Sequence, residues 1–158
     1  MSKQSKSKIP SRDTRSIRLS STGWIIKSLG TWLDTQIKEG LKPLGLSISH
    51  FSVMMTLLEN DGLTQIEIGR QLTMPGSAIT RNIDRLEQIG YVKRHNHETS
   101  RRSYRIHLTD EGRKIAPQLY SVVEDVNKHF LSSLSLADKN KFQTILLQLF
   151  THVSTENT

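Results

Sequence analysis

The stretch that decides the fold runs from Leu63 to Thr109 and reads LTQIEIGRQLTMPGSAITRNIDRLEQIGYVKRHNHETSRRSYRIHLT. It opens on Thr64-Gln65-Ile66-Glu67, which has the pattern of a capping box. In that motif a hydroxyl and a carboxylate three residues later satisfy free amides at a helix start. The short helix that this predicts ends near Leu72. Met74-Pro75-Gly76 follows as a turn, because proline and glycine interrupt a helix.

A second helix is expected directly after the turn. Its inward face is marked by apolar residues three and four positions apart, namely Ile79, Ile83 and Leu86. It should end at Gly90, because glycine readily takes the left-handed conformation at a helix C-terminus. Gly69 in the first helix has the small side chain that lets two helices cross at close range. Two helices joined by so few residues predict a helix-turn-helix.

The face of the second helix opposite Ile79 is polar, with small and basic residues at its start. At 100° per residue it holds Ser77, Arg81, Asp84 and Gln88, with Ala78 and Arg85 beside them. Small residues let a helix backbone approach the DNA major groove, and arginine can pair bidentately with guanine. A solvated helix face has much the same composition, so this helix alone leaves both interpretations open.

Two strands are expected after this helix, at residues 91–96 and 103–108, because apolar and polar residues alternate there. The loop expected between them, residues 97–102, is polar and contains Arg101 and Arg102. A hairpin tip with two arginines suits a DNA minor groove, whose negative potential attracts guanidinium groups. The alternative is a charged loop that keeps the hairpin in solution.

Long helices are expected on both sides of this unit. Residues 16–39 and 110–133 each carry an apolar stripe with helical spacing, and Pro117 should kink the second of these helices or loosen one of its turns. Ser135 begins another capping-box pattern, followed by a further regular stripe. These helices have little of their own chain left to pack on, so we expect them to bury their stripes across a symmetric dimer. The residues expected at that interface are Ile17, Leu119, Val122, Phe142, Ile145, Leu146, Leu149 and Phe150.

The expected fold is mainly α, with a small antiparallel sheet of two or three strands, and its organisation has four parts. They are a flexible basic tail at residues 1–15, an N-terminal dimerisation helix at 16–45, a winged helix-turn-helix at 46–109 and C-terminal dimerisation helices at 110–158. Ser47 or Ser49 is expected to cap the helix that leads to Leu63. The tail is either a solubilising extension or an arm that touches the DNA backbone.

Charge and composition narrow the classes of partner. The formal net charge of the 158 residues is +7, and residues 64–108 alone carry eight Lys/Arg against four Asp/Glu, or +4. Residues 1–20 carry six Lys/Arg against one Asp, or +5. This excess of positive charge favours a polyanion as partner. The absence of cysteine excludes disulfides and thiolate sites. No apolar run approaches the roughly 20 residues of a membrane span, so we expect a cytoplasmic, nucleoid-associated protein with no membrane partner.

The sequence resembles the multiple antibiotic resistance regulator (MarR) family of bacterial transcription factors, most of all its SlyA branch. The family resemblance rests on residues 63–65, 67–69, 72, 78–81, 83–87, 90–92, 101–102 and 108–112, and the likeness to the SlyA branch rests on residues 41–44 and 46–47. It implies a triangular homodimer, with the first and the last two helices at the interface and one winged motif at each lower corner. It also implies binding to palindromic promoter DNA, as a repressor or as an activator that displaces a DNA silencing protein.

The resemblance also implies which residues contact DNA. It puts Ser77, Ala78, Thr80, Arg81 and Asn82 near base edges, Gln65 near a phosphate and Arg102 in the minor groove, and Arg85 and Arg101 complete the expected set. The family usually has an acid just before the two basic wing residues, where this chain has Ser100. Glu98 could take the place of that acid.

Members of the family often bind small aromatic acids between the dimer helices and the DNA-binding unit. The resemblance implies that Thr31, Phe51 and Met55 lie near such a pocket. The same residues also fit ordinary core and interface positions. Lys27 and Lys38 are the only cations between Arg18 and Lys42, so a carboxylate ligand would have few partners there.

Other chemistry is not favoured. His95, His97 and His107 could come close on the hairpin and hold zinc, but polar strand residues are the simpler interpretation. The sequence has no glycine-rich phosphate loop, no HExxH helix and no nucleophile elbow, so we expect no metal site, no cofactor and no enzymatic activity. An interaction module whose winged helix binds protein remains the alternative from another class.

Overall fold

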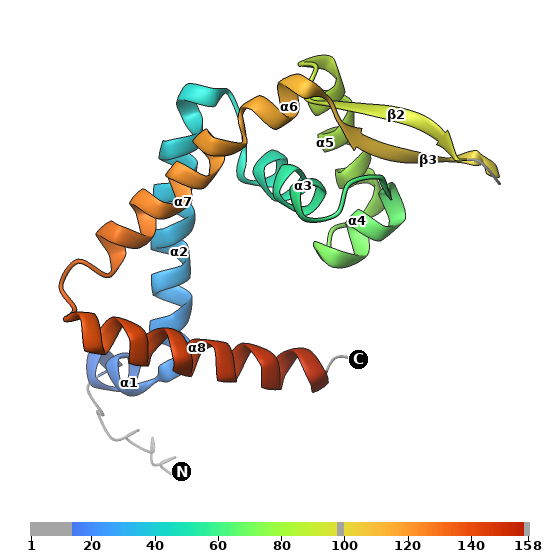
Figure 1. The fold of residues 1–158 in the computed structure, drawn as a ribbon. Coiled ribbons are helices and arrows are strands. Elements are labelled where there is room, and N and C mark those ends of the chain that lie inside the picture. Colours follow the sequence, from blue (N-terminus) through green and yellow to red (C-terminus); the bar gives the residue numbers. More distant parts are fainter. Residues whose placement is uncertain (1–13, 98–99, 157–158) are drawn as a thin grey trace, which may run out of the picture.

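The computed structural model describes residues 14–97 and 100–156, and residues 1–13, 98–99 and 157–158 lie outside the described part. The chain forms a helical arm and a smaller head (Figure 1). The arm consists of α1 (Thr14–Ser20), α2 (Thr22–Leu41), α7 (Ala116–Phe130) and α8 (Leu136–Glu156). The head consists of α3 (Ile48–Glu59), β1 (Leu63–Thr64), α4 (Gln65–Gln71), α5 (Gly76–Gln88), β2 (Val92–His97), β3 (Ser100–Leu108) and α6 (Asp110–Lys114). The short 3-10 helix η1 (Lys42–Leu44) joins arm and head.

The helix expected at residues 16–39 is divided into α1 and α2, so the prediction of one continuous helix is wrong. The division occurs at Ser21, whose hydroxyl accepts a hydrogen bond from the backbone N–H of Trp24 at 3.3 Å. A serine in this position begins a new helix because its side chain satisfies a free amide. At the other end α2 continues to Leu41, and Pro43 lies in the first turn of η1.

The helix expected at residues 110–133 is also divided, into α6 and α7, with the break at Ile115. Pro117 lies in the first turn of α7, where the missing N–H of proline costs no helical hydrogen bond. It therefore begins a helix rather than kinking one. Ser135 accepts a hydrogen bond from the N–H of Asp138 at 3.2 Å, so the expected cap of α8 is confirmed.

The head contains one antiparallel sheet with the strand order β1-β3-β2, which confirms the small sheet expected from the sequence. Leu63 pairs with Ile106, and Val92 pairs with Leu108. The hairpin strands are longer than the sequence predicted, since β3 begins at Ser100. Arg101 and Arg102 therefore belong to a strand and not to the loop in which they were expected.

The core lies mainly in the head, where α3, α4 and α5 pack against one another and the sheet. Its fully buried side chains include Val53, Met54, Leu57, Ile68, Ile79, Ile83, Leu86 and Ile106. Leu41 of α2 and Leu119 of α7 join this core and tie the arm to the head. Leu119 is 0% exposed within its own chain, so its expected place at a dimer interface is wrong.

The two arm helices α2 and α7 meet closely at Gly40. A Cβ added at Gly40 would lie 2.8 Å from Cγ1 of Val122, so a larger residue there would force the Val122 side chain to move. Val122 is partly buried against the core of its own chain. Its expected interface position therefore competes with an intrachain contact that the sequence pattern did not show.

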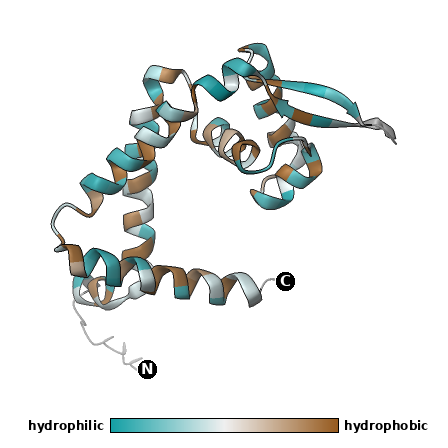
Figure 2. Cartoon of the chain, viewed as in Figure 1, coloured by the Kyte–Doolittle hydropathy of each residue, from teal (hydrophilic) through white to brown (hydrophobic). Residues whose placement is uncertain are grey.

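The far end of the arm leaves apolar side chains exposed. α8 crosses the lower end of α2 near α1 and then runs away from the arm, and it carries several hydrophobic residues along its length (Figures 1 and 2). Exposed large hydrophobic residues there include Ile17, Trp24, Ile26, Ile145, Leu149 and Phe150, and the last of these is 72% exposed. Among the described helices, no single one is long and apolar enough to cross a membrane. The segments Thr22–Leu44 and Ile48–Glu59 reach that length and apolar content only together, and the chain bends by 82° between them.

Candidate nucleic-acid interface

The interface begins at the N-terminus of α4, where the predicted capping box is confirmed. The N–H of Thr64 donates to Oε2 of Glu67 at 2.7 Å, and the N–H of Glu67 donates to Oγ1 of Thr64 at 3.3 Å. The hydrogen bond from the Thr64 backbone, followed by that from its hydroxyl, lowers the pKa of the Glu67 carboxyl. The start of α4 is thus fixed by residues that are neighbours in the sequence.

The turn between α4 and α5 depends on a close approach at Gly69. A Cβ at this position would lie 3.2 Å from the carbonyl oxygen of Met74 and 3.4 Å from Cγ1 of Ile79. The N–H of Met74 donates to the carbonyl of Gly69 at 2.9 Å, and Thr73 takes a left-handed φ of 52°. The expected helix-turn-helix is therefore present, with its two helices in direct contact.

The helix α5 buries one face and exposes the other. Ile79, Ile83 and Leu86 are fully buried, as predicted. The open face presents Ser77, Thr80, Arg81, Asp84, Arg85 and Gln88, and all six are exposed. Ala78 and Asn82 are half-buried, and the Asn82 amide approaches the sulfur of Met74 at 3.9 Å, so it points back towards the turn.

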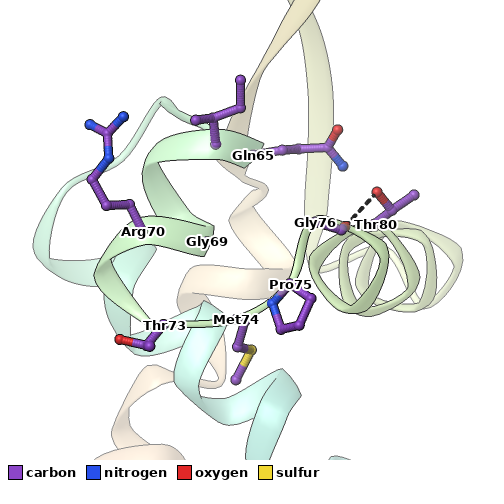
Figure 3. A pocket seen from close by; sticks show the side chains of 9 residues that line it. Gln65, Gly69, Arg70, Thr73, Met74, Pro75, Gly76 and Thr80 are labelled. Atoms are coloured by element: carbon purple, nitrogen blue, oxygen red, sulfur yellow. Dashed lines mark hydrogen bonds between the residues drawn. The ribbon is translucent and has the colours of Figure 1, made fainter.

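A groove of about 710 Å³ lies between α4 and the N-terminus of α5 (Figure 3). Gln65 points towards Gly76 and Thr80, and Arg70 lines the groove from α4. Within the described part of the chain, the buried Nε2 of Gln65 has no hydrogen-bond partner. Among the side chains that the structure describes, none caps α5. The groove therefore brings a spare amide donor close to the positive end of a helix dipole.

Asp61 anchors the base of the β2–β3 hairpin, which we call the wing. Its Oδ1 accepts a hydrogen bond from the N–H of Leu108 at 2.9 Å, and its Oδ2 lies 2.6 Å from Nη2 of Arg113. Nδ1 of His107 lies 3.4 Å from the same Oδ2. This carboxylate joins the end of α3 to the end of β3 and to α6.

Arg94 of β2 connects the wing to α5, and it was not among the residues that the sequence singled out. Its Nη2 lies 2.5 Å from Oδ1 of Asp84, and its Nη1 lies 2.5 Å from Oε2 of Glu87. Its backbone N–H also donates to Oε1 of Glu87 at 2.9 Å. That backbone hydrogen bond, together with the guanidinium of Arg94, lowers the pKa of the Glu87 carboxyl against the opposing effect of burial.

The tip of the wing is only partly described. The backbone of β3 includes Ser100, Arg101 and Arg102, and the wing extends well beyond the rest of the head (Figure 1). Glu98, which we expected could replace an acid at position 100, lies outside the described residues. The expected contact of Arg102 with a minor groove thus stays a prediction.

The histidines of the wing form a pair in the structure. The rings of His95 and His107 are tilted against each other with centroids 5.0 Å apart. The side chain of His97 lies outside the description. Among the side chains that the structure describes, no group of three or more His, Cys, Asp or Glu is arranged to hold a metal ion.

The residues expected near an effector lie in different environments. Phe51 and Met55 are partly buried and pack against the core of the head. Thr31 is exposed on α2, and its hydroxyl donates to the carbonyl of Lys27 at 3.0 Å. A separate apolar cavity of about 410 Å³ lies at the far end of the arm between α2, α7 and α8. Its walls include the expected interface residues Phe142, Ile145, Leu146 and Leu149.

Comparison with known proteins agrees with this architecture. The MarR family model matches residues 46–104. The HTH-type transcriptional regulator PrsX of Escherichia coli is 31% identical over 123 residues, which are 77% of this chain and 74% of PrsX. The HTH-type transcriptional repressor Rv2887 of Mycobacterium tuberculosis is 28% identical over 127 residues, which are 80% of this chain and 91% of Rv2887.

Solved structures show the same similarity. A MarR transcriptional regulator from Methanosarcina mazei Go1 superposes with a TM-score of 0.79 at 26% identity, over 84% of this chain and 96% of that one. Rv2887 superposes with a TM-score of 0.73 at 24% identity in its complex with DNA, over 82% of this chain and 98% of that one. The structure of Rv2887 in complex with salicylic acid superposes with a TM-score of 0.69 at 27% identity, over 82% of this chain and 96% of that one. The similarity includes both the head and the arm.

Proposed function

The chain belongs to the MarR family of transcription regulators, and on that premise we propose that it binds palindromic promoter DNA as a homodimer. The observation that carries the proposal is α5, which buries its apolar face and presents an open polar face beside the wing. A helix fixed in this way can enter a major groove while the hairpin reaches an adjacent minor groove. The DNA complex of Rv2887 supports the proposal by analogy.

We propose that α5 reads base edges through its exposed N-terminal half. Ser77, Ala78 and Thr80 let the helix backbone approach, and Arg81 and Arg85 supply the guanidinium groups that pair with guanine or phosphate. Asn82 has a smaller share in this contact, because its amide points towards Met74. Arg101 and Arg102 are proposed for the minor groove.

Gln65 is proposed to bind a DNA phosphate. Its Nε2 points towards the start of α5, and no described residue bonds to this nitrogen or caps that helix. Because this nitrogen is buried in the free chain, we propose that the side chain turns outwards on binding. A phosphate oxygen would then accept the amide hydrogen and face the positive end of the helix dipole. Such a contact fixes the register of the head on the duplex without contributing sequence information.

The homodimer is proposed to form through the far end of the arm. Ile17, Phe142, Ile145, Leu146, Leu149 and Phe150 supply apolar surface there, and all except Phe142 are exposed in the single chain. Contiguous apolar surface of this kind marks a protein interface. A two-fold axis through it would place two copies of α5 on two half-sites of one palindrome.

We further propose that a small aromatic ligand adjusts the position of the head, and that Thr31, Phe51 and Met55 lie near it. The salicylic acid complex of Rv2887 supports this by analogy. These residues lie on α2 and α3, the two helices joined by η1 between arm and head. We also propose that the protein acts in the cytoplasm, on the nucleoid, and carries out no catalysis.

The direct test is selection of bound fragments from genomic DNA, followed by titration of the full chain on the selected duplex and on a scrambled one at several salt concentrations. We expect recovery of a palindrome, tighter binding to it, and affinity that falls steeply with salt because bound arginines release counterions. Equal, salt-independent binding to both duplexes would contradict the proposal and would favour a protein-binding winged helix.

A further inference from the structure

We propose that Arg94 is a positioning residue that fixes the direction of the wing relative to α5, so that both reach the same DNA site. The inference rests on the proposed DNA-binding function and extends it to a residue that need not touch DNA. Three hydrogen bonds join this one residue of β2 to two carboxylates of α5, those of Asp84 and Glu87.

The geometry of this contact suits arginine in particular. One terminal nitrogen of the guanidinium donates to Glu87 and the other donates to Asp84. The backbone N–H of Arg94 donates to the second carboxylate oxygen of Glu87. A planar fork with fixed donors holds two acceptors in one orientation, which the single ammonium of lysine does not do. The contact therefore fixes the direction of β2 as well as its distance from α5.

The burial of Arg94 indicates that its side chain binds residues of its own chain and not DNA. Its side chain is only 19% exposed, against 36% for Glu87 and 57% for Asp84. A guanidinium so enclosed and bonded to two carboxylates has little capacity left for a phosphate. Its positive charge also offsets two acids on the recognition helix, which would otherwise repel the DNA backbone.

The length of the wing makes the direction of its base important. Arg94 pairs with Ile106, and Arg102 lies four residues nearer the tip of the wing on β3. At about 3.3 Å per residue, this is roughly 13 Å, so a tilt of about 10° at the base moves the backbone of Arg102 by about 2 Å. Such a shift is several times the tolerance of about 0.5 Å within which binding residues must be held to act together. Loss of the Arg94 contact should therefore move Arg102 out of reach of the DNA minor groove.

A double-mutant cycle on the selected duplex tests this coupling. We expect Arg102→Ala to weaken binding about tenfold in the wild-type background and by less than about twofold in an Arg94→Gln background. Lys93→Gln is the matched control, because it removes a neighbouring positive charge from an exposed position of β2. In that background Arg102→Ala should keep its full effect. Equal effects of Arg102→Ala in the Arg94→Gln and Lys93→Gln backgrounds would overturn the proposal.

A second measurement does not depend on DNA. The chain has no cysteine, so Asn96→Cys and Gln71→Cys create a defined pair of spin-label sites on the wing and α4. With labelled chain diluted into unlabelled chain, Arg94→Gln should broaden or shift the distance distribution, and Arg94→Lys should restore it only in part. An unchanged distribution in Arg94→Gln would refute the positioning role even if DNA binding is confirmed. Failure of the wild type to bind any selected duplex would instead contradict the proposed function.

Discussion

His50 lies at the first turn of α3, where its own chemistry affects the stability of the head. Its Nδ1 accepts a hydrogen bond from the N–H of Ser47 at 3.2 Å, and its N–H donates to Oγ of Ser47 at 3.2 Å. Burial lowers the pKa of His50, and the positive charge of Arg85 lowers it further. The folded head therefore favours the neutral imidazole, which is the form that can accept at Nδ1.

The stability of the protein should fall on acidification for this reason. The folded pKa of His50 lies below the ordinary value of 6.5, so its contribution is fully present above about pH 6.5 and is lost as the pH falls through the folded pKa. Between pH 7.5 and pH 5.5 the unfolding temperature should fall less in His50→Gln than in the wild type. Glutamine does not titrate, and it can still accept the hydrogen bond from Ser47 at both pH values. Identical losses would show that His50 has no part in the effect.

Arg81 is the residue whose replacement should change base preference most clearly. It is exposed on the N-terminal half of α5, where a guanidinium can reach guanine. Arg81→Ala should cost about 1 to 3 kcal/mol of binding free energy and reduce discrimination at one base position of each half-site. Titrations with single-base variants of the duplex measure both effects. Lys128→Ala is the control, because it removes an exposed positive charge from α7 in the arm, and it should leave base preference unchanged.

The residues that sequence analysis identified correctly have partners nearby in the chain. The capping box of Thr64 and Glu67 has both members within one helical turn, so its pattern was sufficient. Arg94 of β2 bonds to two residues of α5 that lie seven and ten positions earlier in the chain. Neither the helical nor the strand spacing of the sequence predicts a contact between such positions. Leu119 lies on an apolar stripe, and a stripe alone does not show whether the same chain or a partner covers it.

At the scale of elements, contacts between segments of the head fix where its helices begin and end. α6 begins where the N–H of Thr109 donates to the carbonyl of Tyr91 at 3.1 Å and its hydroxyl donates to the carbonyl of Gly90 at 2.6 Å. A Cβ on Gly112 would lie 2.1 Å from the Tyr91 oxygen. The helices expected from the sequence are present, but their ends depend on such contacts, and for that reason two long predicted helices are divided.

Gly112→Ala should therefore destabilise the junction of α6 with β2. Backbone must move to relieve the clash, and such overpacking costs typically about 1 to 3 kcal/mol. Gly23→Ala in α2 is the matched control, because a Cβ there would meet nothing within 4 Å, so this change should be neutral or stabilising. Urea unfolding at a fixed protomer concentration measures both. Equal stability of the two variants would contradict the close approach at Tyr91.

At the scale of the whole molecule, the arm holds the apolar surface and the head holds the polar face. The head has its own buried core, whereas α8 exposes Ile145, Leu146, Leu149 and Phe150 by 37% or more. Burying these residues in a second copy would fix the distance between the two heads. The specificity of the protein would then depend on the arm as much as on α5.

Leu149→Asp should break this dimer, because a carboxylate buried in an apolar interface has no partner. Gln148→Asp adds the same charge one residue away, on another face of α8, and should leave the dimer intact. Sedimentation velocity over a range of micromolar concentrations should show monomer for the first variant and dimer for the second. A dimer that survives Leu149→Asp would place the interface elsewhere.

The stoichiometry of the complex on one palindromic duplex tests the central claim most directly. The mass of the complex, measured by native mass spectrometry or analytical ultracentrifugation at a DNA concentration well above Kd, should equal two chains per duplex. A duplex with one half-site scrambled should bind much more weakly, because one head then lacks its bases. One chain per palindrome, or equal affinity for the intact and half-scrambled duplexes, would contradict the claim that paired heads read the two half-sites.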